Sequence, residues 1–181
     1  MRYVCLFAAL LSFHTLLPAK PPVPRPAKEF HCSDANGKDL SLSRFKGKVV
    51  LIQFLITNCS HCQALSRVLT ALQAEYGPQG FQAFGVAIND ATPEMVRSYV
   101  KDLQLSIPVG FAPREQAVSY LGISAVERLA VPQVIVIDRQ GIVQAQSDAQ
   151  GTSTLQDENY LRELIGKLLK SGSGTTASAR Q

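Results

Sequence analysis

The sequence has few cysteines, few charged residues and no tryptophan, and the first two shortages narrow the range of folds. Four cysteines among 181 residues are too few for a disulfide-stapled scaffold, so hydrophobic burial must hold the fold together. Charged residues make up 18% of the chain and apolar residues 46%. These proportions exclude a disordered, collagen-like or multi-pass membrane protein, and one ordinary globular domain fits them.

The chain also lacks an excess of basic charge beyond its first residues. Lys and Arg number 18 against 14 Asp and Glu, a net charge of +4. Four of the basic residues, Arg2, Lys20, Arg25 and Lys28, precede the first acidic residue, Glu29. From Glu29 onward the two signs balance, so the surplus gives no support to a nucleic-acid-binding face on the folded part.

The first 19 residues have the pattern of an export signal. After Met1 and Arg2, no charged side chain occurs from Tyr3 to Ala19, and this run is rich in Leu, Ala and Phe. As a helix it would span about 25 Å, short of a bilayer core of about 30 Å. A cleaved signal peptide and an uncleaved N-terminal anchor both stay open, because Leu17 is a poor match to the small residue expected before a cut after Ala19. In both cases the rest of the chain is exported.

Segments of biased composition border the predicted domain. Residues 18–26 hold five of the ten prolines, which predicts a semi-rigid extended linker over 20–28. Residues 171–181 are mainly Ser, Gly, Thr and Ala, too poor in apolar side chains to pack, and are predicted to be a disordered tail. The folded domain is therefore predicted over 29–170.

Hydrophobic periodicity predicts that strands and helices alternate within this domain. Near-continuous apolar runs of strand length, typical of central strands covered on both faces, occur at 49–55, 81–88 and 133–138. Helices are predicted over 62–76, 92–103, 114–121 and 157–170, with a short strand at 108–111 and a hairpin turn at 139–141. The predicted order is β-α-β-α-β-α-β-β-α.

A Cys59-Ser60-His61-Cys62 motif lies where the predicted strand 49–55 ends and the next helix begins. Free amide groups and the helix dipole at a helix N-terminus stabilise a thiolate, which favours Cys59 as the reactive thiol. Cys62 follows one turn later, within reach of the first sulfur. A C-x-x-C in this position strongly indicates redox chemistry.

His61 is the most informative of the three histidines. A protonated imidazole between the cysteines stabilises the Cys59 thiolate, which favours the dithiol and makes the disulfide more oxidising. The alternative interpretation is an exposed helix residue without a redox role. Ser60, which precedes His61 in the motif, is likewise predicted to be a supporting residue of the site.

The residues around the motif resemble a known family. Asn36-Gly37-Lys38 through Leu42, the run FKGKVVLIQF over 45–54, and then Cys59 and Cys62 resemble the exported thioredoxin-fold thiol–disulfide oxidoreductases of the TlpA/ResA type, relatives of the redoxin (AhpC/TSA) group. The resemblance covers roughly residues 29–170. It implies an α/β, thioredoxin-like fold, in which a central mixed β-sheet of four or five strands has helices on both faces. It also implies an inserted helix and strand, here 92–111, after the second core strand, which agrees with the periodicity.

The resemblance further implies an enzyme that exchanges protein thiols and disulfides in the periplasm or cell envelope without a cofactor. Its partners would be protein substrates with thiols or disulfides and a redox partner protein, with no nucleic acid and membrane contact only through an N-terminal anchor. A cis peptide bond at Val131-Pro132, facing the cysteines, is implied as well. The His-Cys half of the motif, together with Val131, is closer to the strongly oxidising DsbA group than to thioredoxin.

The chain departs from the family pattern near the motif. An aromatic residue usually precedes the first cysteine, where this chain has Asn58. The buried carboxylate of thioredoxin falls on Gln53, so no proton acceptor for Cys62 is identified. The connection Ser124–Ala130 is longer than the usual one.

A redoxin-type peroxidase is one alternative. Such enzymes need a Pro and a Thr or Ser at set distances before the reactive cysteine, where this chain has Ile52 and Ile56. Cys32 is the remaining cysteine of the mature chain, besides Cys59 and Cys62. It could serve as a resolving or regulatory thiol or form an intermolecular disulfide. Burial as a small apolar residue is the favoured interpretation of Cys32.

A copper- or zinc-binding module of thioredoxin fold is the other alternative. Cys59, Cys62 and a histidine would bind the metal, but a closed zinc site needs four ligands. The only other side chains available as metal ligands are those of His31, Cys32 and His61. His31 and Cys32 are predicted to lie on a distant first strand. No metal site is therefore predicted.

Overall fold

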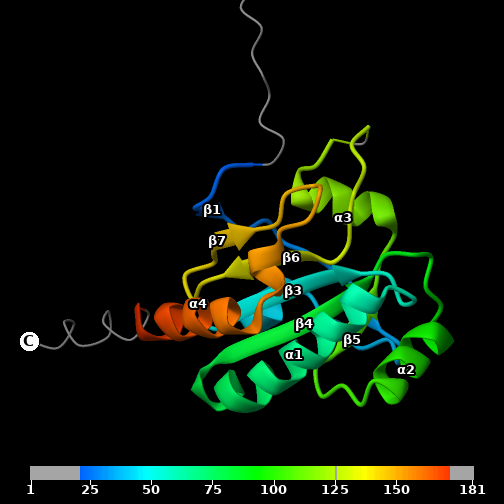
Figure 1. Cartoon of the computed structure of the whole chain (residues 1–181), viewed down its shortest axis with the longest axis horizontal. Helices are drawn as coiled ribbons and strands as arrows, with labels where there is room; N and C mark the ends of the chain where they lie inside the picture. The colour runs from blue at the N-terminus through cyan, green and yellow to red at the C-terminus, as the bar shows by residue number, and fades with distance from the viewer. Residues whose placement is uncertain (1–20, 125, 172–181) are drawn as a thin grey trace, which may run out of the picture.

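The computed structural model describes residues 21–124 and 126–171 (Figure 1). The predicted signal peptide or anchor at 1–19 and the predicted tail, apart from Ser171, lie outside these residues. None of the helices described combines the length and hydropathy that are needed to cross a bilayer.

A mixed sheet forms the centre of the described chain. Its seven strands lie in the order β1-β7-β6-β3-β4-β5-β2. Their bounds are β1 Arg25–Pro26, β2 Ser33–Asp34, β3 Val49–Leu55, β4 Phe81–Ala87, β5 Val109–Phe111, β6 Gln133–Ile137 and β7 Ile142–Gln146. Strands β3, β4 and β5 are parallel, whereas β6 and β7 form an antiparallel hairpin beside β3, and β1 and β2 pair antiparallel at the two edges.

Helices cover both faces of this sheet (Figure 1). Helices α1, Ser60–Tyr76, and α4, Glu158–Ser171, pack on one face, and α3, Arg114–Leu121, packs on the other. Helix α2, Pro93–Asp102, lies next to β5 and contributes to the same core as α1 and α4. Thr92 caps α2 by accepting the amide hydrogen of Met95, and Pro93 occupies its first position.

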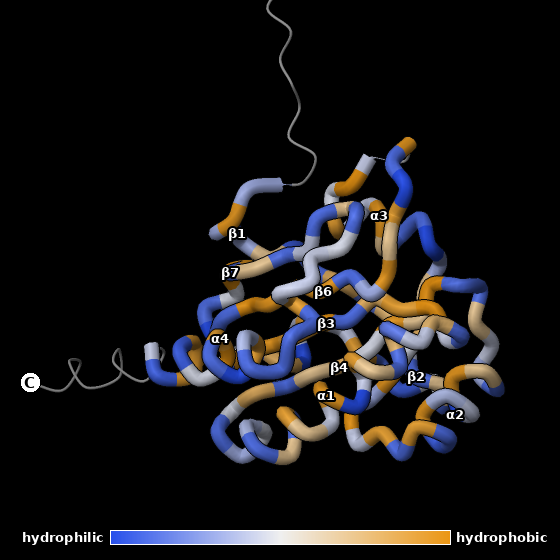
Figure 2. The backbone as a smooth tube through the Cα atoms, in the orientation of Figure 1, coloured by the Kyte–Doolittle hydropathy of each residue, from blue (hydrophilic) through white to orange (hydrophobic). Residues whose placement is uncertain are grey.

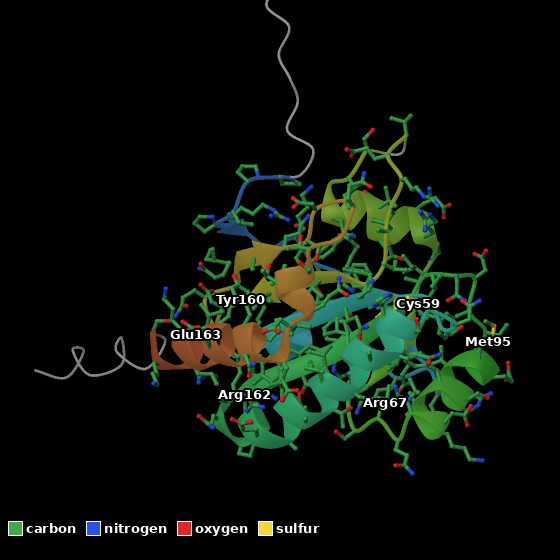
Figure 3. The ribbon with its side chains drawn as sticks, in the orientation of Figure 1. Cys59, Arg67, Met95, Tyr160, Arg162 and Glu163 are labelled. Carbon is green, nitrogen blue, oxygen red and sulfur yellow. The ribbon has the colours of Figure 1, made fainter. Side chains whose placement is uncertain are left out.

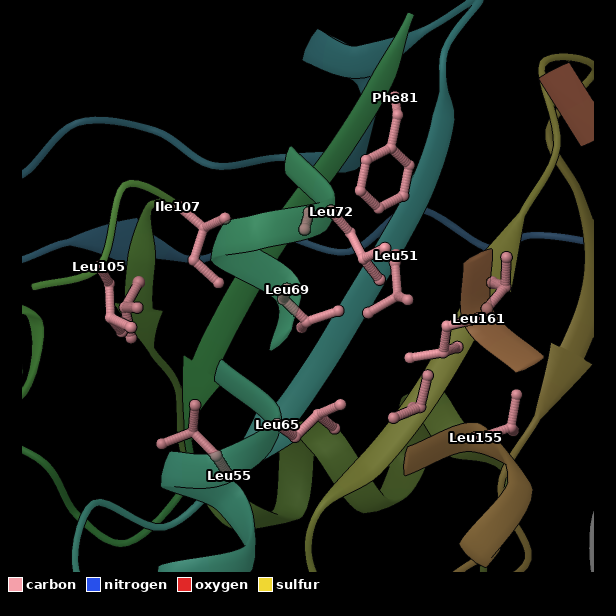
Figure 4. Packing of buried hydrophobic residues seen from close by; sticks show 14 of the residues in the cluster. Leu51, Leu55, Leu65, Leu69, Leu72, Phe81, Leu105, Ile107, Leu155 and Leu161 are labelled. Atoms are coloured by element: carbon pink, nitrogen blue, oxygen red, sulfur yellow. The ribbon is translucent and has the colours of Figure 1, made fainter. Parts of the chain in front are cut away.

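Strand β3 is buried along its whole length because both of its faces are covered. Leu51 and Leu55 pack toward α1, beside Leu69 (Figure 4), whereas Ile52 and Phe54 pack in the core under α3. These four side chains of β3 are completely buried, and Figure 2 shows hydrophobic stretches of the backbone along the central strands. Two-sided burial thus explains why the sequence of this strand reads as an unbroken apolar run.

The predicted fold class is confirmed, including the inserted α2 and β5. From β3 onward the element order is the predicted one. The sheet has seven strands instead of the four or five expected, because β1 and β2 have two residues each and are too short to show a hydrophobic period.

The predicted linker at 20–28 ends inside the sheet. Arg25 and Pro26 form β1, and the amide of Ala27 donates to the carbonyl of Gly141 at 2.8 Å. The Arg25 guanidinium also donates to the side chain of Gln146. Proline is tolerated here because an edge strand leaves one row of amide positions unpaired. The folded part of the chain therefore begins before Glu29.

Candidate active site

Cys59 is the N-cap residue of α1 and lies at the end of that helix nearest α2 (Figure 3). Its backbone is extended, with φ −93° and ψ 119°. The sulfur accepts the amide hydrogen of Cys62 at an N···S distance of 3.3 Å and lies 4.0 Å from the carbonyl oxygen of Val131. The side chain is half-buried. The geometry that begins the helix therefore also places a hydrogen-bond donor on this sulfur.

Cys62 has a different environment, one turn into the same helix. Cys62 is completely buried. Cys32, Cys59 and Cys62 are all free thiols. Burial raises the pKa of the Cys62 thiol well above its usual value, and the hydrogen bond with Cys59 raises it further, whereas the backbone of Ile56 acts in the opposite direction. At neutral pH Cys62 is therefore a neutral thiol beside a more exposed partner.

The Val131-Pro132 peptide bond is cis, as the resemblance implied. It directly precedes β6, and the contact between its carbonyl and Cys59 brings it to the cysteine pair. Val131 is partly exposed, and Pro132 is buried. The structure therefore brings these two residues and both cysteines together, although Val131 and Cys59 are 72 positions apart in the sequence.

His61 and Ser60 occupy the exposed side of the first turn of α1. Within the described residues, neither side chain makes a hydrogen bond or an ion pair. Both lie between the cysteines in sequence but face solvent. The imidazole of His61 is therefore accessible from solvent.

The loop that carries Cys59 is held by polar contacts. Asn89, just after β4, donates from its amide nitrogen to the Thr57 hydroxyl at 3.1 Å and accepts from the Thr57 amide at 3.4 Å. Gln63 donates to the Thr57 carbonyl at 3.0 Å. Sequence reasoning missed Asn89, because a polar side chain next to a strand end gives no signal of its partner 32 positions away.

Gln53, at the position of thioredoxin's carboxylate, is buried on β3 and bonded on both sides. Its amide nitrogen donates to the Cys62 carbonyl at 2.9 Å, and its oxygen accepts from the Ser66 hydroxyl at 2.8 Å. The Tyr99 hydroxyl lies 2.8 Å from the Ser66 oxygen. Ser66 and Tyr99 were not singled out in the sequence, where they look like ordinary members of amphipathic helices.

A groove of about 460 Å³ separates the loop before Cys59 from α2. Thr57, Asn58 and Gln63 line one side of this groove. On the α2 side, the groove is lined by Met95, whose side chain is 38% exposed (Figure 3). The groove therefore has both apolar and polar lining, and it reaches Asn58, the residue before Cys59.

Cys32 lies in the other core, against the β2–β5 edge, and is 9% exposed. Burial, with smaller contributions from Asp39 and Asp34, raises the pKa of its thiol to about 12. In the residues described, no three His, Cys, Asp or Glu side chains gather in a group that could hold a metal ion.

A model of the AhpC/TSA family matches residues 23–146. Thiol-disulfide oxidoreductase ResA of Bacillus thuringiensis subsp. konkukian is 26% identical over 145 residues, which cover 80% of each chain. Among solved structures, a thiol:disulfide interchange protein DsbE from Chlorobium tepidum is 25% identical, with a TM-score of 0.66 over 81% of this chain and 96% of that one. A protein disulfide isomerase from Bacteroides thetaiotaomicron, 22% identical, has the same fold with a TM-score of 0.68 over 83% and 92% of the two chains.

These similarities confirm the resemblance seen in the sequence and the oxidoreductase class of the enzyme. The match to the family model covers more than half of the chain. The protein belongs to the AhpC/TSA family and is a redoxin of the TlpA/ResA type.

Proposed function

We propose that this enzyme exchanges thiols and disulfides with other proteins outside the cytoplasm, and that Cys59 and Cys62 are its catalytic residues. The observation that carries the proposal is the asymmetry of the pair. Cys59 is accessible at a helix N-terminus and accepts an amide hydrogen, whereas Cys62 is fully buried. A nucleophilic thiol needs access and gains from a hydrogen-bond donor at its sulfur, and of the two cysteines only Cys59 has both.

In the reducing direction, the Cys59 thiolate attacks one sulfur of a substrate disulfide. A mixed disulfide forms between Cys59 and the substrate, and the other substrate sulfur leaves as a thiolate and takes up a proton. Cys62 then loses its proton and attacks the Cys59 sulfur, which releases the second substrate thiol. The substrate has gained two electrons and two protons, and the enzyme holds a Cys59–Cys62 disulfide. The oxidising direction is the reverse of these steps.

The supporting residues act around the Cys59 sulfur. The carbonyl of Val131 lies beside this sulfur and offers an acceptor to the backbone of a bound peptide. The exposed imidazole of His61 stabilises the thiolate when protonated. Ser60 is exposed at the same rim. The groove beside Met95 gives the substrate segment a place to lie.

The proposed location is the periplasm or cell envelope. The apolar, uncharged run from Tyr3 to Ala19 supports export, with an N-terminal anchor as the alternative to cleavage. A C-x-x-C enzyme in an oxidising compartment meets proteins with disulfides and needs a redox partner protein to restore its starting state. Cell fractionation with an antibody to the folded domain checks the location, and the mass of the mature N-terminus distinguishes cleavage from anchoring.

Catalysed reduction of a disulfide-containing protein such as insulin, with dithiothreitol as reductant, tests the activity. We expect catalysis by the wild type and by Cys32→Ser, and none by Cys59→Ser. Consumption of hydrogen peroxide is measured with the same variants. Peroxide turnover without turnover of insulin would identify a peroxidase and overturn the proposal.

A further inference from the structure

Three buried polar side chains form a hydrogen-bonded chain behind the redox pair. They come from three elements: Gln53 from β3, Ser66 from α1 and Tyr99 from α2. Gln53 and Ser66 are completely buried, and Tyr99 is 5% exposed. Tyr99 belongs to the hydrophobic core that α1, α2 and α4 share. Buried polar groups are costly there unless they are hydrogen-bonded, and each of these three side chains has a partner, so the chain indicates a specific role.

The chain has a defined direction. A serine hydroxyl has one hydrogen, and the Ser66 hydroxyl gives it to the Gln53 side-chain oxygen at 2.8 Å. The Tyr99 hydroxyl, 2.8 Å from the Ser66 oxygen, is therefore the donor in that contact. Burial raises the pKa of Tyr99 to about 12, which keeps this hydroxyl protonated. The donors thus run from the inserted helix α2 to the carbonyl of Cys62.

The last bond in this chain acts on the residue whose amide faces the reactive sulfur. Gln53 holds the Cys62 carbonyl at 2.9 Å, and the amide of the same residue lies 3.3 Å from the Cys59 sulfur. Fixing the carbonyl therefore limits how the first turn of α1 can tilt. A thiolate accepts an amide hydrogen more strongly than a disulfide sulfur does, because hydrogen bonds to a charged acceptor are stronger. A well-placed amide therefore favours the reduced pair.

We propose that Tyr99, acting through Ser66 and Gln53, is a positioning residue that makes the Cys59–Cys62 disulfide more oxidising. The inserted helix α2 then has a second use besides lining the groove, because it supplies the distal donor of the chain. This inference rests on the proposed function, since it concerns the same pair of cysteines. The Tyr99 hydroxyl then tunes the reduction potential of the pair without touching the reacting sulfur atoms.

The test is the equilibrium between the cysteine pair and a glutathione buffer, read from the mass shift of alkylated protein. Tyr99→Phe keeps the ring and removes only the hydroxyl. We expect this variant to shift the equilibrium at least threefold toward the disulfide, which lowers the reduction potential by about 14 mV at roughly 30 mV per tenfold for a two-electron couple. Ser66→Ala is expected to shift it in the same direction.

Tyr120→Phe is the matched control. Tyr120 packs in the other core, and its buried hydroxyl has no hydrogen-bond partner within the described residues. We expect this variant to leave the potential unchanged. The double variant Tyr99→Phe/Ser66→Ala should shift the equilibrium by less than the product of the two single shifts, because both changes interrupt one chain.

The outcomes separate this inference from the proposed function. A wild-type pair that does not equilibrate with glutathione would count against the proposed function itself. A wild-type pair that equilibrates normally, with Tyr99→Phe shifting the equilibrium less than threefold (below about 14 mV at roughly 30 mV per tenfold), would overturn only the role of Tyr99. A loss of stability in Tyr99→Phe without a change in potential would likewise show that the hydroxyl is structural.

Discussion

The backbone amide of Cys62 donates to the sulfur of Cys59 at 3.3 Å, which makes the two cysteines unequal although they are three residues apart. The half-buried Cys59 accepts the hydrogen bond, and the fully buried Cys62 donates it from its backbone. Thiol exchange requires a first attack and a later resolution. This relationship supports the proposal that Cys59 makes the first attack and that Cys62 resolves the mixed disulfide.

The first prediction concerns trapped intermediates. Cys62→Ser should accumulate mixed disulfides between Cys59 and partner proteins, because the thiol that resolves them is missing. Cys59→Ser should accumulate none, and Cys32→Ser should turn over nearly as the wild type does. The measurement is mass spectrometry of cross-linked peptides from cells that express each variant. Cross-links through Cys62 or Cys32 would show that the roles are assigned wrongly.

The second prediction concerns the direction of the reaction. If His61 favours the Cys59 thiolate, the reduction potential of the pair lies above the roughly −270 mV of thioredoxin. His61→Ala should lower it by about 5–20 mV, a small shift because exposed charges are screened by water. His31→Ala is the control, since His31 bonds Ser41 in the segment before β3. A wild-type value at or below that of thioredoxin would remove the role proposed for His61.

The local parts of this molecule were predictable because each leaves a pattern in adjacent residues. Two-sided burial of β3 leaves an unbroken apolar run, and the helix that starts at Ser60 places Cys59 and Cys62 one turn apart. Both features depend on short-range geometry. The edge strand at Arg25–Pro26 leaves no pattern, because its position depends on a pairing with β7 more than 100 residues later.

The surroundings of the pair could not be predicted for the same reason. Asn89, just after β4, contacts Thr57, and Tyr99 on α2 contacts Ser66. The residues next to Asn89 and Tyr99 in the sequence give no sign of these contacts. Gln53 was noticed only because a carboxylate was expected there. Its amide instead donates to the Cys62 carbonyl, a role that is fixed by the tertiary packing of α1 on β3.

The third prediction concerns the loop before Cys59. Asn89→Ala removes both side-chain contacts with Thr57, so the cysteine is less firmly held at the helix start. We expect the free energy of unfolding to fall by about 1 kcal/mol and the rate of exchange with oxidised glutathione to fall up to about fivefold. Asn159→Ala, on the exposed side of α4, is the control and should change neither. An unchanged rate in Asn89→Ala would show that these contacts do not position the sulfur.

The fourth prediction concerns alkaline pH and the buried thiols of the reduced protein. Burial raises the pKa of Cys32 from 9.0 to about 12 and also raises that of Cys62. Above pH 9 the unfolded chain therefore loses protons that the folded chain retains. The contribution of the two neutral thiols to the stability of the folded state is therefore complete below this pH. It is lost as the pH rises toward the pKa values that the thiols have in the folded protein. Each thiol should lower the free energy of unfolding by up to about 1.4 kcal/mol per pH unit.

Urea unfolding under reductant between pH 8 and about 10 measures this slope. Cys32→Ser should remove one thiol's share of the slope. An equal slope in this variant and the wild type would mean that Cys32 ionises alike in both states, which contradicts its burial.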